Sequence, residues 1–287
     1  MRTRSLFLLA VFLALPDTPC AQEGGVLLKY AYPSGKKVIY KIKSNTDLSV
    51  GIQANNLLEW TSVEELTGVR EDGSSSISAV ISGVSESVFV GGQLIRQKVF
   101  DLLVGEAFHF SLTPTGTLKD FVPPPLKNLP GSQREALQIV VTNLELLYAS
   151  YYPELPKGPV RVGDSWTARR EIKLNYEMMR AEGSALISSV YKIKAAKKKD
   201  GFGCFEIEEK SQITIRQHIN FGEISVITDG TGTATDKWLF DYERGITQSY
   251  EEETKIDVQS IRVGIPGAKP VESLIKASSK RELKKIE

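Results

Sequence analysis

Apolar and polar residues alternate along most of the chain with a period of two. Val38, Tyr40 and Ile42 alternate with Lys41 and Lys43, which is the pattern of a strand buried on one face. Further runs of this kind are 57–69, 76–90, 107–112, 117–121, 165–174, 184–194, 202–216, 223–234, 237–242 and 246–258. These runs are rich in β-branched and aromatic residues and are separated by Gly, Asp and Ser, so the pattern predicts antiparallel meanders.

One stretch has the period of a helix instead. It follows the proline-rich residues 121–131, and Ser132 stands three residues before Glu135, as in a capping box. The pattern ends before Pro153 and predicts an amphipathic helix over Ser132–Tyr151. An apolar stripe needs a surface to pack against, so we expect this helix on the concave face of a sheet.

Three glycine turns of the first half recur in the second half at nearly constant spacing. The offsets are 128, 128 and 129 residues, and the pairs are Gly35 with Gly163, Gly73 with Gly201, and Gly116 with Gly245. A fixed period predicts two copies of one β unit. The alternative is ordinary turn spacing in a chain with 23 glycines. An internal duplication predicts that the two halves superpose at these turns.

These patterns divide the chain into five segments: 1–21 as a signal peptide, 26–122 as a first β unit, 123–157 as connector and helix, 158–263 as a second β unit, and 264–287 as a C-terminal tail. Residues 273–287 of the tail carry five basic residues, and we expect either a short docking helix or a solvated end. The predicted fold is β-dominated α+β: antiparallel meander sheets, half-barrel-like, with one central amphipathic helix.

The first 21 residues have the parts of a secretory signal peptide. Arg2 and Arg4 precede the apolar run 6–15, and small residues follow. The run is shorter than the roughly 20 residues of a spanning helix. We therefore expect a secreted or periplasmic protein without a transmembrane segment after signal removal. Lipidation at Cys20 stays open, although residues 17–19 lack the leucine and small residues typical of such signals.

Composition argues against several functions. The 36 basic and 35 acidic residues are balanced, so no global field indicates a nucleic-acid partner. His109 and His218 lack neighbours at ligand spacing, and Cys204 stands in an apolar strand pattern that indicates burial. We therefore expect no metal, no cofactor, no catalytic residue and no enzymatic activity.

The acidic residues are predicted to lie on a solvated face. Glu64–Glu65, Glu208–Glu209 and Glu251–Glu253 alternate with apolar residues or stand near predicted strand ends. Two acids converging in a cleft would instead favour a hydrolase.

The segment 151–166 combines Pro-Glu-Leu-Pro with Val-Gly-Asp-Ser-Trp. Its prolines and glycines turn the chain from helix to strand, and Trp166 anchors that strand. This passage, residues 30–40 and the hairpins around Gly116 and Gly245 resemble an uncharacterised family of secreted bacterial proteins of unknown function. The resemblance implies a β-rich extracytoplasmic protein and assigns no site residues.

The periodicity and helix placement also resemble the half-barrel of periplasmic lipoprotein carriers, whose concave face holds acyl chains, although fold does not fix function. We expect a non-enzymatic binding or envelope-associated protein holding an apolar small molecule or lipid between helix and sheet. The alternative is a scaffold that binds an envelope protein through its sheet edges; a hydrolase is less favoured. Candidate ligand-lining residues are Leu137, Val141, Leu144, Tyr148, Trp166 and Trp238.

Overall fold

The structure is a computed structural model that describes residues 25–50, 52–95, 100–124, 140–141, 144–174, 180–220 and 222–287. The first half of the chain forms β1 (Lys37–Val50), β2 (Ile52–Val69), β3 (Ser75–Val90), β4 (Gln93–Ile95), the 3-10 helix η1 (Phe100–Leu103), β5 (Ala107–Leu112) and β6 (Leu118–Val122). The second half forms β7 (Ser165–Lys173), β8 (Ala181–Lys199), β9 (Phe202–Asn220), β10 (Ser225–Asp241), β11 (Ile246–Val263) and β12 (Val271–Ile286).

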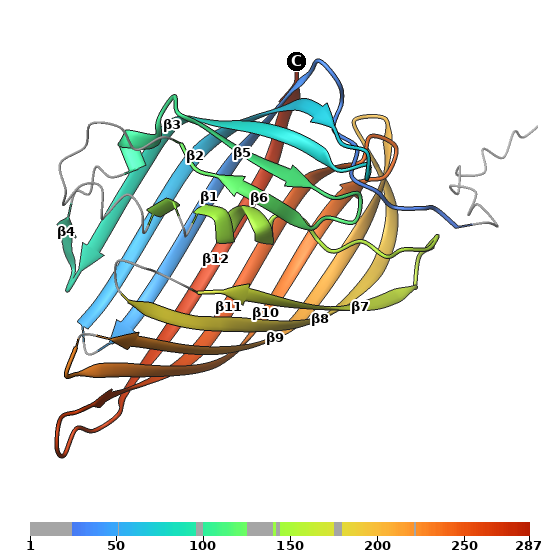
Figure 1. Cartoon of the computed structure of the whole chain (residues 1–287). Helices are drawn as coiled ribbons and strands as arrows, with labels where there is room; N and C mark the ends of the chain where they lie inside the picture. Colours follow the sequence, from blue (N-terminus) through green and yellow to red (C-terminus); the bar gives the residue numbers. More distant parts are fainter. Residues whose placement is uncertain are drawn as a thin grey trace, which may run out of the picture.

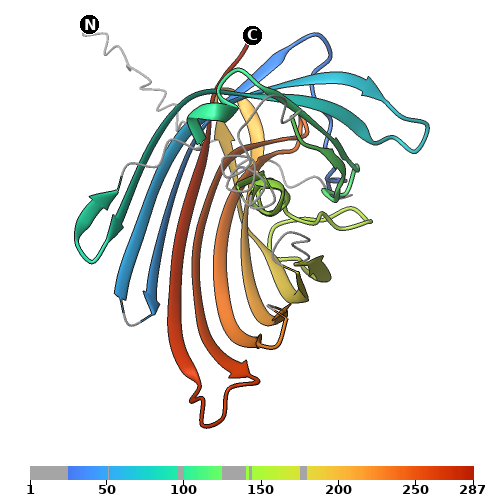
Figure 2. The same cartoon turned by 60° about the vertical axis from the view of Figure 1, so that its left-hand side comes forward.

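In this part of the chain the twelve strands form one antiparallel sheet that curves around a helix (Figures 1 and 2). The strand order is β6-β5-β3-β2-β1-β12-β11-β10-β9-β8-β7, and β4 pairs with β3. No ladder joins β6 to β7 among the described residues, so the sheet is open. The prediction of a β-dominated α+β fold, with antiparallel meanders and one central helix, is confirmed.

Two predicted strands are one strand in the structure. The runs 223–234 and 237–242 merge into β10, because Asp236 continues the period of two as a buried residue. A charged residue at a core-facing position interrupted the apolar pattern and suggested a break that does not exist.

The C-terminal segment 264–287 is neither a helix nor a solvated tail, and that expectation was wrong. It contains β12, which pairs with β1 on one side and β11 on the other. The core-facing positions of β12 include Ser279 and Arg281, both buried. These polar residues concealed the alternation of a central strand, and β12 is the strand that joins the two halves of the sheet.

The helix packs on the concave side, as predicted. Residues 140–141 and 144–150 are helical, and Tyr148 is fully buried there, with its ring centroid 4.9 Å from that of Phe108. The Tyr148 hydroxyl donates a hydrogen bond to Ser62 on β2 at 2.7 Å. The predicted helix start at Ser132 lies outside the described residues.

All six glycines of the predicted repeat have positive φ. The two members of each pair occupy matching places along the chain. Gly35 precedes β1 and Gly163 precedes β7, and Gly73 lies between β2 and β3 as Gly201 does between β8 and β9. Gly116 lies between β5 and β6, and Gly245 lies between β10 and β11. This placement agrees with a duplication, which stays a prediction until the halves are superposed.

Gly116 is expected to be much less replaceable than Gly35, another glycine of the repeat. Its φ is 94°, and a Cβ there would lie 2.3 Å from the carbonyl oxygen of Pro153. Gly116→Ala should lower the free energy of unfolding by about 2–3 kcal/mol, since strain in φ adds to a backbone clash. Gly35 also has positive φ, but a Cβ added there would meet no atom within 4 Å. In urea denaturation Gly35→Ala should cost only about 1 kcal/mol, and equal losses in both variants would contradict the clash.

Candidate functional site

The inner face of the sheet is the face that carries Tyr40 and the helix. Neighbouring strands are in register, so the inner-face side chains form rows that cross the sheet. Three kinds of row follow one another along the strands: aromatic, carboxyl-bearing and aliphatic. Their order decides which part of the inner face is filled by the protein and which part stays accessible.

The aromatic row is covered. Trp238 and Tyr250 are partners on β10 and β11, with ring centroids 5.0 Å apart, and both are buried. Tyr151, directly after the helix, lies against Tyr250 with a centroid distance of 5.5 Å. The helix and the residues around Tyr30 therefore fill this part of the concave side with a packed core.

A buried ion pair lies in the same region. Arg281 on β12 and Glu64 on β2 have fully buried side chains, and Nη2 of Arg281 donates to both Glu64 oxygens at 2.6 and 2.8 Å. Tyr32 and Tyr152 also donate hydrogen bonds to Glu64. The expectation that Glu64 faces solvent was wrong, because its charge is paired and hydrogen-bonded inside the core.

Next along the strands comes a row with several carboxyl groups. From β3 to β7 its members are Glu86, Leu58, Ser44, Ser279, Glu252, Asp236, Glu209, Tyr191 and Trp166. We call its three adjacent acids, Glu209, Asp236 and Glu252, the carboxyl row. Glu209 is 3% exposed and Asp236 is 7% exposed, so the expectation of a solvated face was wrong for Glu209 as well.

The three acids differ in their hydrogen bonds. Ser189 and Ser211 donate to Glu209, whereas Tyr250 donates to Glu252 at 2.8 Å. Oδ1 of Asp236 has no hydrogen-bond partner among the described residues. Burial, together with the neighbouring charges of Glu209 and Glu252, raises the pKa of Asp236 to about 10. At neutral pH the Asp236 carboxyl is therefore protonated.

Beyond the carboxyl row the inner face of β8 to β12 is uncharged, whereas the edge strand β7 carries Arg170, the partner of Ile187, whose Nη1 donates to the carbonyl oxygen of Ala149 at 2.8 Å. The inner-face positions within 181–189, 211–219, 226–234, 254–260 and 271–277 carry no ionisable side chain. The partly exposed residues that we call the aliphatic face are Leu48, Ile187, Ile215, Ile256, Val258 and Ile275. Most apolar side chains on a sheet face that encloses a core are fully buried, so this partial exposure indicates a surface that another apolar molecule could cover.

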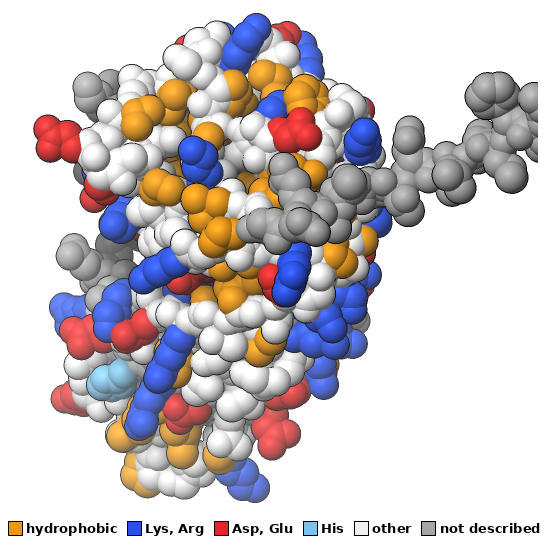
Figure 3. All heavy atoms as spheres, turned by 90° about the vertical axis from the view of Figure 1, so that its right-hand side faces the viewer, with side chains coloured by type: hydrophobic (Ala, Val, Ile, Leu, Met, Phe, Trp, Pro, Cys, Tyr) orange, Lys and Arg blue, Asp and Glu red, His pale blue; other side chains and the backbone are white. Residues whose placement is uncertain are grey.

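The outer face contrasts with it. Arg216, Asp229, Lys255, Asp257 and Lys276 stand at outer positions of the same strand segments, and all are exposed. On the side of the molecule in Figure 3, basic and acidic side chains are interspersed with apolar ones. The aliphatic face therefore differs from the outer face of its own strands.

The predicted ligand-lining residues lie mostly in the filled part of the concave side. Val141, Leu144, Tyr148 and Trp238 are buried in the core. Trp166 stacks on Tyr191 with a centroid distance of 5.2 Å, and its Nε1 donates to the carbonyl oxygen of Glu154 at 2.7 Å. Leu137 lies outside the described residues. The structure brings the described candidates together, but as contacts within the protein.

Sequence reasoning missed the aliphatic face. The signal was present in β9, where Ile213, Ile215 and Ile219 alternate with polar residues. This alternation predicts a strand, but the pattern alone does not distinguish a covered apolar face from an accessible one. The predicted burial of Cys204 is confirmed, and His109 and His218 are exposed.

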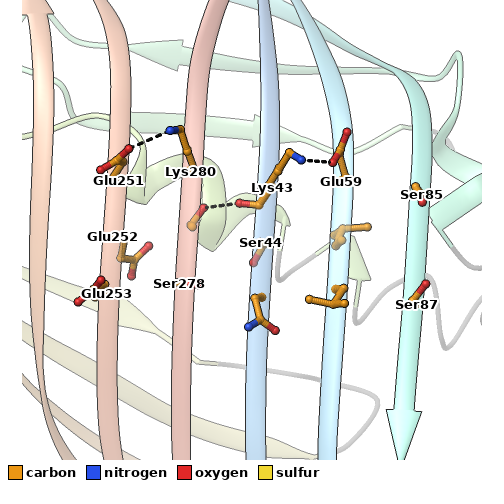
Figure 4. A pocket seen from close by; sticks show the side chains of 14 residues that line it. Lys43, Ser44, Glu59, Ser85, Ser87, Glu251, Glu252, Glu253, Ser278 and Lys280 are labelled. Atoms are coloured by element: carbon orange, nitrogen blue, oxygen red, sulfur yellow. Dashed lines mark hydrogen bonds and ion pairs between the residues drawn. The ribbon is translucent and has the colours of Figure 1, made fainter. Parts of the chain in front are cut away.

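A shallow hollow of about 550 Å³ lies over β3, β2, β1, β12 and β11, lined mainly by outer-face residues (Figure 4). Its charges are paired with one another: Lys43 with Glu59 at 2.7 Å and Lys280 with Glu251 at 3.0 Å. These ion pairs leave little unsatisfied charge for a ligand, so the hollow is a weaker candidate than the aliphatic face.

Within the described residues, no group of three or more His, Cys, Asp or Glu side chains is arranged to hold a metal ion. A search of the same residues finds no helix with the length and apolar character needed to cross a bilayer.

The open curved sheet with an enclosed helix defines the structural class to which the chain can be compared. No protein-family model matches the sequence, and no curated protein is detectably similar to it. Among solved structures, the chain is similar to lipovitellin, in a structure concerned with lipid–protein interactions, with a TM-score of 0.53 and 10% identity. The similarity covers 89% of this chain and 26% of the lipovitellin chain, so it is a similarity of fold to about a quarter of that protein.

Proposed function

We propose that this protein binds an apolar ligand, such as the acyl chains of a lipid, on the aliphatic face. The observation that carries the proposal is the uncharged and partly exposed inner face of β8 to β12 beyond the carboxyl row. Burying a methylene group contributes about 0.8 kcal/mol. An acyl chain that crosses several rows of the aliphatic face would therefore gain several kcal/mol of binding free energy. The fold similarity to lipovitellin supports a lipid as the ligand class.

The proposal includes an extracytoplasmic location and a non-enzymatic role. The location is supported by the basic start and short apolar run of residues 2–15. A carrier or binding role needs no catalytic group, whereas a hydrolase would need a placed nucleophile or an acid pair flanking a substrate bond. In the structure the carboxyl row instead adjoins the aliphatic face.

Ile215→Glu is expected to weaken binding of a neutral pyrene-labelled fatty alcohol at least tenfold. Ile215 lies on the aliphatic face between Ala185 and Gly230, and a carboxylate there would lose its hydration when a chain covers it. Thr214, its neighbour in β9, is exposed on the outer face, so Thr214→Glu is the matched control and should bind as the original protein does. Fluorescence titration of delipidated protein measures both.

Equal affinities of the two variants would remove the aliphatic face as the binding surface. Native mass spectrometry of gently purified protein provides a second measurement, with a copurifying lipid mass as the expected result. If no lipid copurifies and no probe binds, the proposed function is wrong and a scaffold acting through the edge strands β6 and β7 becomes the better hypothesis.

A further inference from the structure

The carboxyl row lies at the border between the covered and the accessible parts of the inner face. On one side, Tyr250 and Trp238 are buried beneath the residues that follow the helix. On the other side, the next inner-face residues are uncharged: Ser211 and Ala234 are buried and Thr254 is partly exposed, and the partly exposed residues Ile215 and Ile256 follow further along the strands. A chain lying on the aliphatic face and running toward the helix would therefore place its polar end against these acids.

The acids of this row lack a cation. None of them forms an ion pair within the described residues; neutral hydroxyls donate to Glu209 and Glu252, and the protonated Asp236 shares a hydrogen bond with Glu209. Arg281 is bound to Glu64. Arg170 on β7 exerts a weak opposing charge effect on Asp236, but its Nη1 donates to the carbonyl oxygen of Ala149 at 2.8 Å.

Asp236 has an unmet hydrogen-bonding requirement. Only 7% of the residue is exposed, and Oδ1 has no partner among the described residues. Asp236 shares a hydrogen bond with Glu209 when it is protonated, but no described residue donates to Oδ1. A buried acceptor without a donor has lost its hydration, so a ligand that donates a hydrogen bond to Oδ1 gains an interaction there. The missing donor at Oδ1 is a separate observation from the clustering of the three acids, and it favours a ligand that carries a hydrogen-bond donor.

A primary ammonium group has the matching chemistry. It carries a positive charge and three N–H donors and accepts no hydrogen bond. A hydroxyl head group supplies one donor without charge, and a carboxylate or phosphate head group would be repelled by Glu252 and Glu209. The row therefore discriminates among lipids by the charge of their polar end.

We propose that the carboxyl row binds the ammonium group of a long-chain amine or aminolipid whose apolar chain lies on the aliphatic face. This inference rests on the proposed function and adds the ligand class. Glu252, partly exposed, meets the ammonium group first, and Asp236 accepts one of its N–H bonds through Oδ1.

Binding is coupled to a proton. The groups facing Asp236 are Glu209, Glu252 and Arg170, with the phenols of Tyr191 and Tyr250 beside them. When an ammonium cation pairs with Asp236, the carboxyl proton leaves to solvent and the carboxylate remains: the charge balance is one cation bound and one proton released. Affinity for the amine should therefore rise with pH between about 6 and 8, where the amine itself stays protonated.

Isothermal titration calorimetry with dodecylammonium and dodecanol, in buffers of different ionisation enthalpy, tests the inference. We expect the amine to bind at least tenfold more tightly than the alcohol, with release of up to one proton. Asp236→Asn should remove the proton release and most of the preference for the amine over the alcohol. Asp229→Asn, an exposed acid of the same strand, should change neither.

Equal affinity for amine and alcohol, or a preference that persists in Asp236→Asn, overturns the inference but leaves the proposed function intact. Failure of both ligands to bind overturns the proposed function itself. Ethylammonium, which lacks the chain, should bind at least tenfold more weakly than dodecylammonium, and equal binding would assign the row to small cations. If Asp236→Asn does not fold, Glu252→Gln at the partly exposed end of the row gives the same comparison.

Discussion

Arg281→Met is expected to lower the free energy of unfolding by about 3–5 kcal/mol, because removing one partner of a buried ion pair leaves the other charge uncompensated. Glu64 would remain fully buried with only neutral hydroxyls, those of Tyr32, Ser62 and Tyr152, as donors among the described residues. The guanidinium also lies 3.6 Å from the ring centroid of Tyr40, and that contact would be lost. The pair connects β12 to β2 across β1, so it holds the C-terminal strand to the first half of the chain.

Urea denaturation at pH 7 measures this loss. Lys280, the preceding residue of β12, is exposed and pairs with Glu251 and Glu282, so Lys280→Met should change stability by less than about 1 kcal/mol. Adding Glu64→Leu to Arg281→Met should recover much of the lost stability, since no buried charge then remains. A loss in Arg281→Met as small as that in Lys280→Met would show that the pair is not important for stability.

The strands were predictable where apolar residues occupy the core-facing positions. β5 has the predicted bounds, Ala107–Leu112, since its alternation is uninterrupted. β10 was divided and β12 was missed for one shared reason: Asp236, Ser279 and Arg281 occupy core-facing positions. A polar residue at such a position is stabilised by partners that are distant in sequence, and a local pattern carries no information about them.

The site depends even more on distant partners. Arg281 and Glu64 are separated by 217 residues, and the carboxyl row becomes visible only when the register of β9, β10 and β11 is known. The helix was predicted and its concave position is confirmed, but how far it covers the inner face depends on its placement along the strands. Because of that placement, predicted ligand-lining residues such as Leu144 are buried in the core, while the aliphatic face stays partly exposed.

The stability of the ligand-free protein is expected to fall as pH rises, and Asp236→Asn should remove much of that dependence. The pKa of Asp236 is raised to about 10 in the folded state, first by burial and then by Glu209 and Glu252, whereas an unfolded aspartate titrates near pH 4. Between these values the folded state holds a proton that the unfolded state has released. The contribution of this proton to the free energy of unfolding is therefore fully present below about pH 4. It is lost as pH rises toward about 10, by at most about 1.4 kcal/mol per pH unit.

Urea denaturation of delipidated protein at pH 6, 7 and 8 checks the sign and the size of this effect. Over these two units the original protein should lose about 2–3 kcal/mol through this group, while Asp236→Asn, which carries no titrating proton there, should show a clearly smaller slope. Asp229→Asn changes an exposed acid of the same strand and should keep the original slope. Parallel pH profiles for all three proteins would mean that Asp236 is ionised when folded, and the row would then attract an ammonium group without releasing a proton.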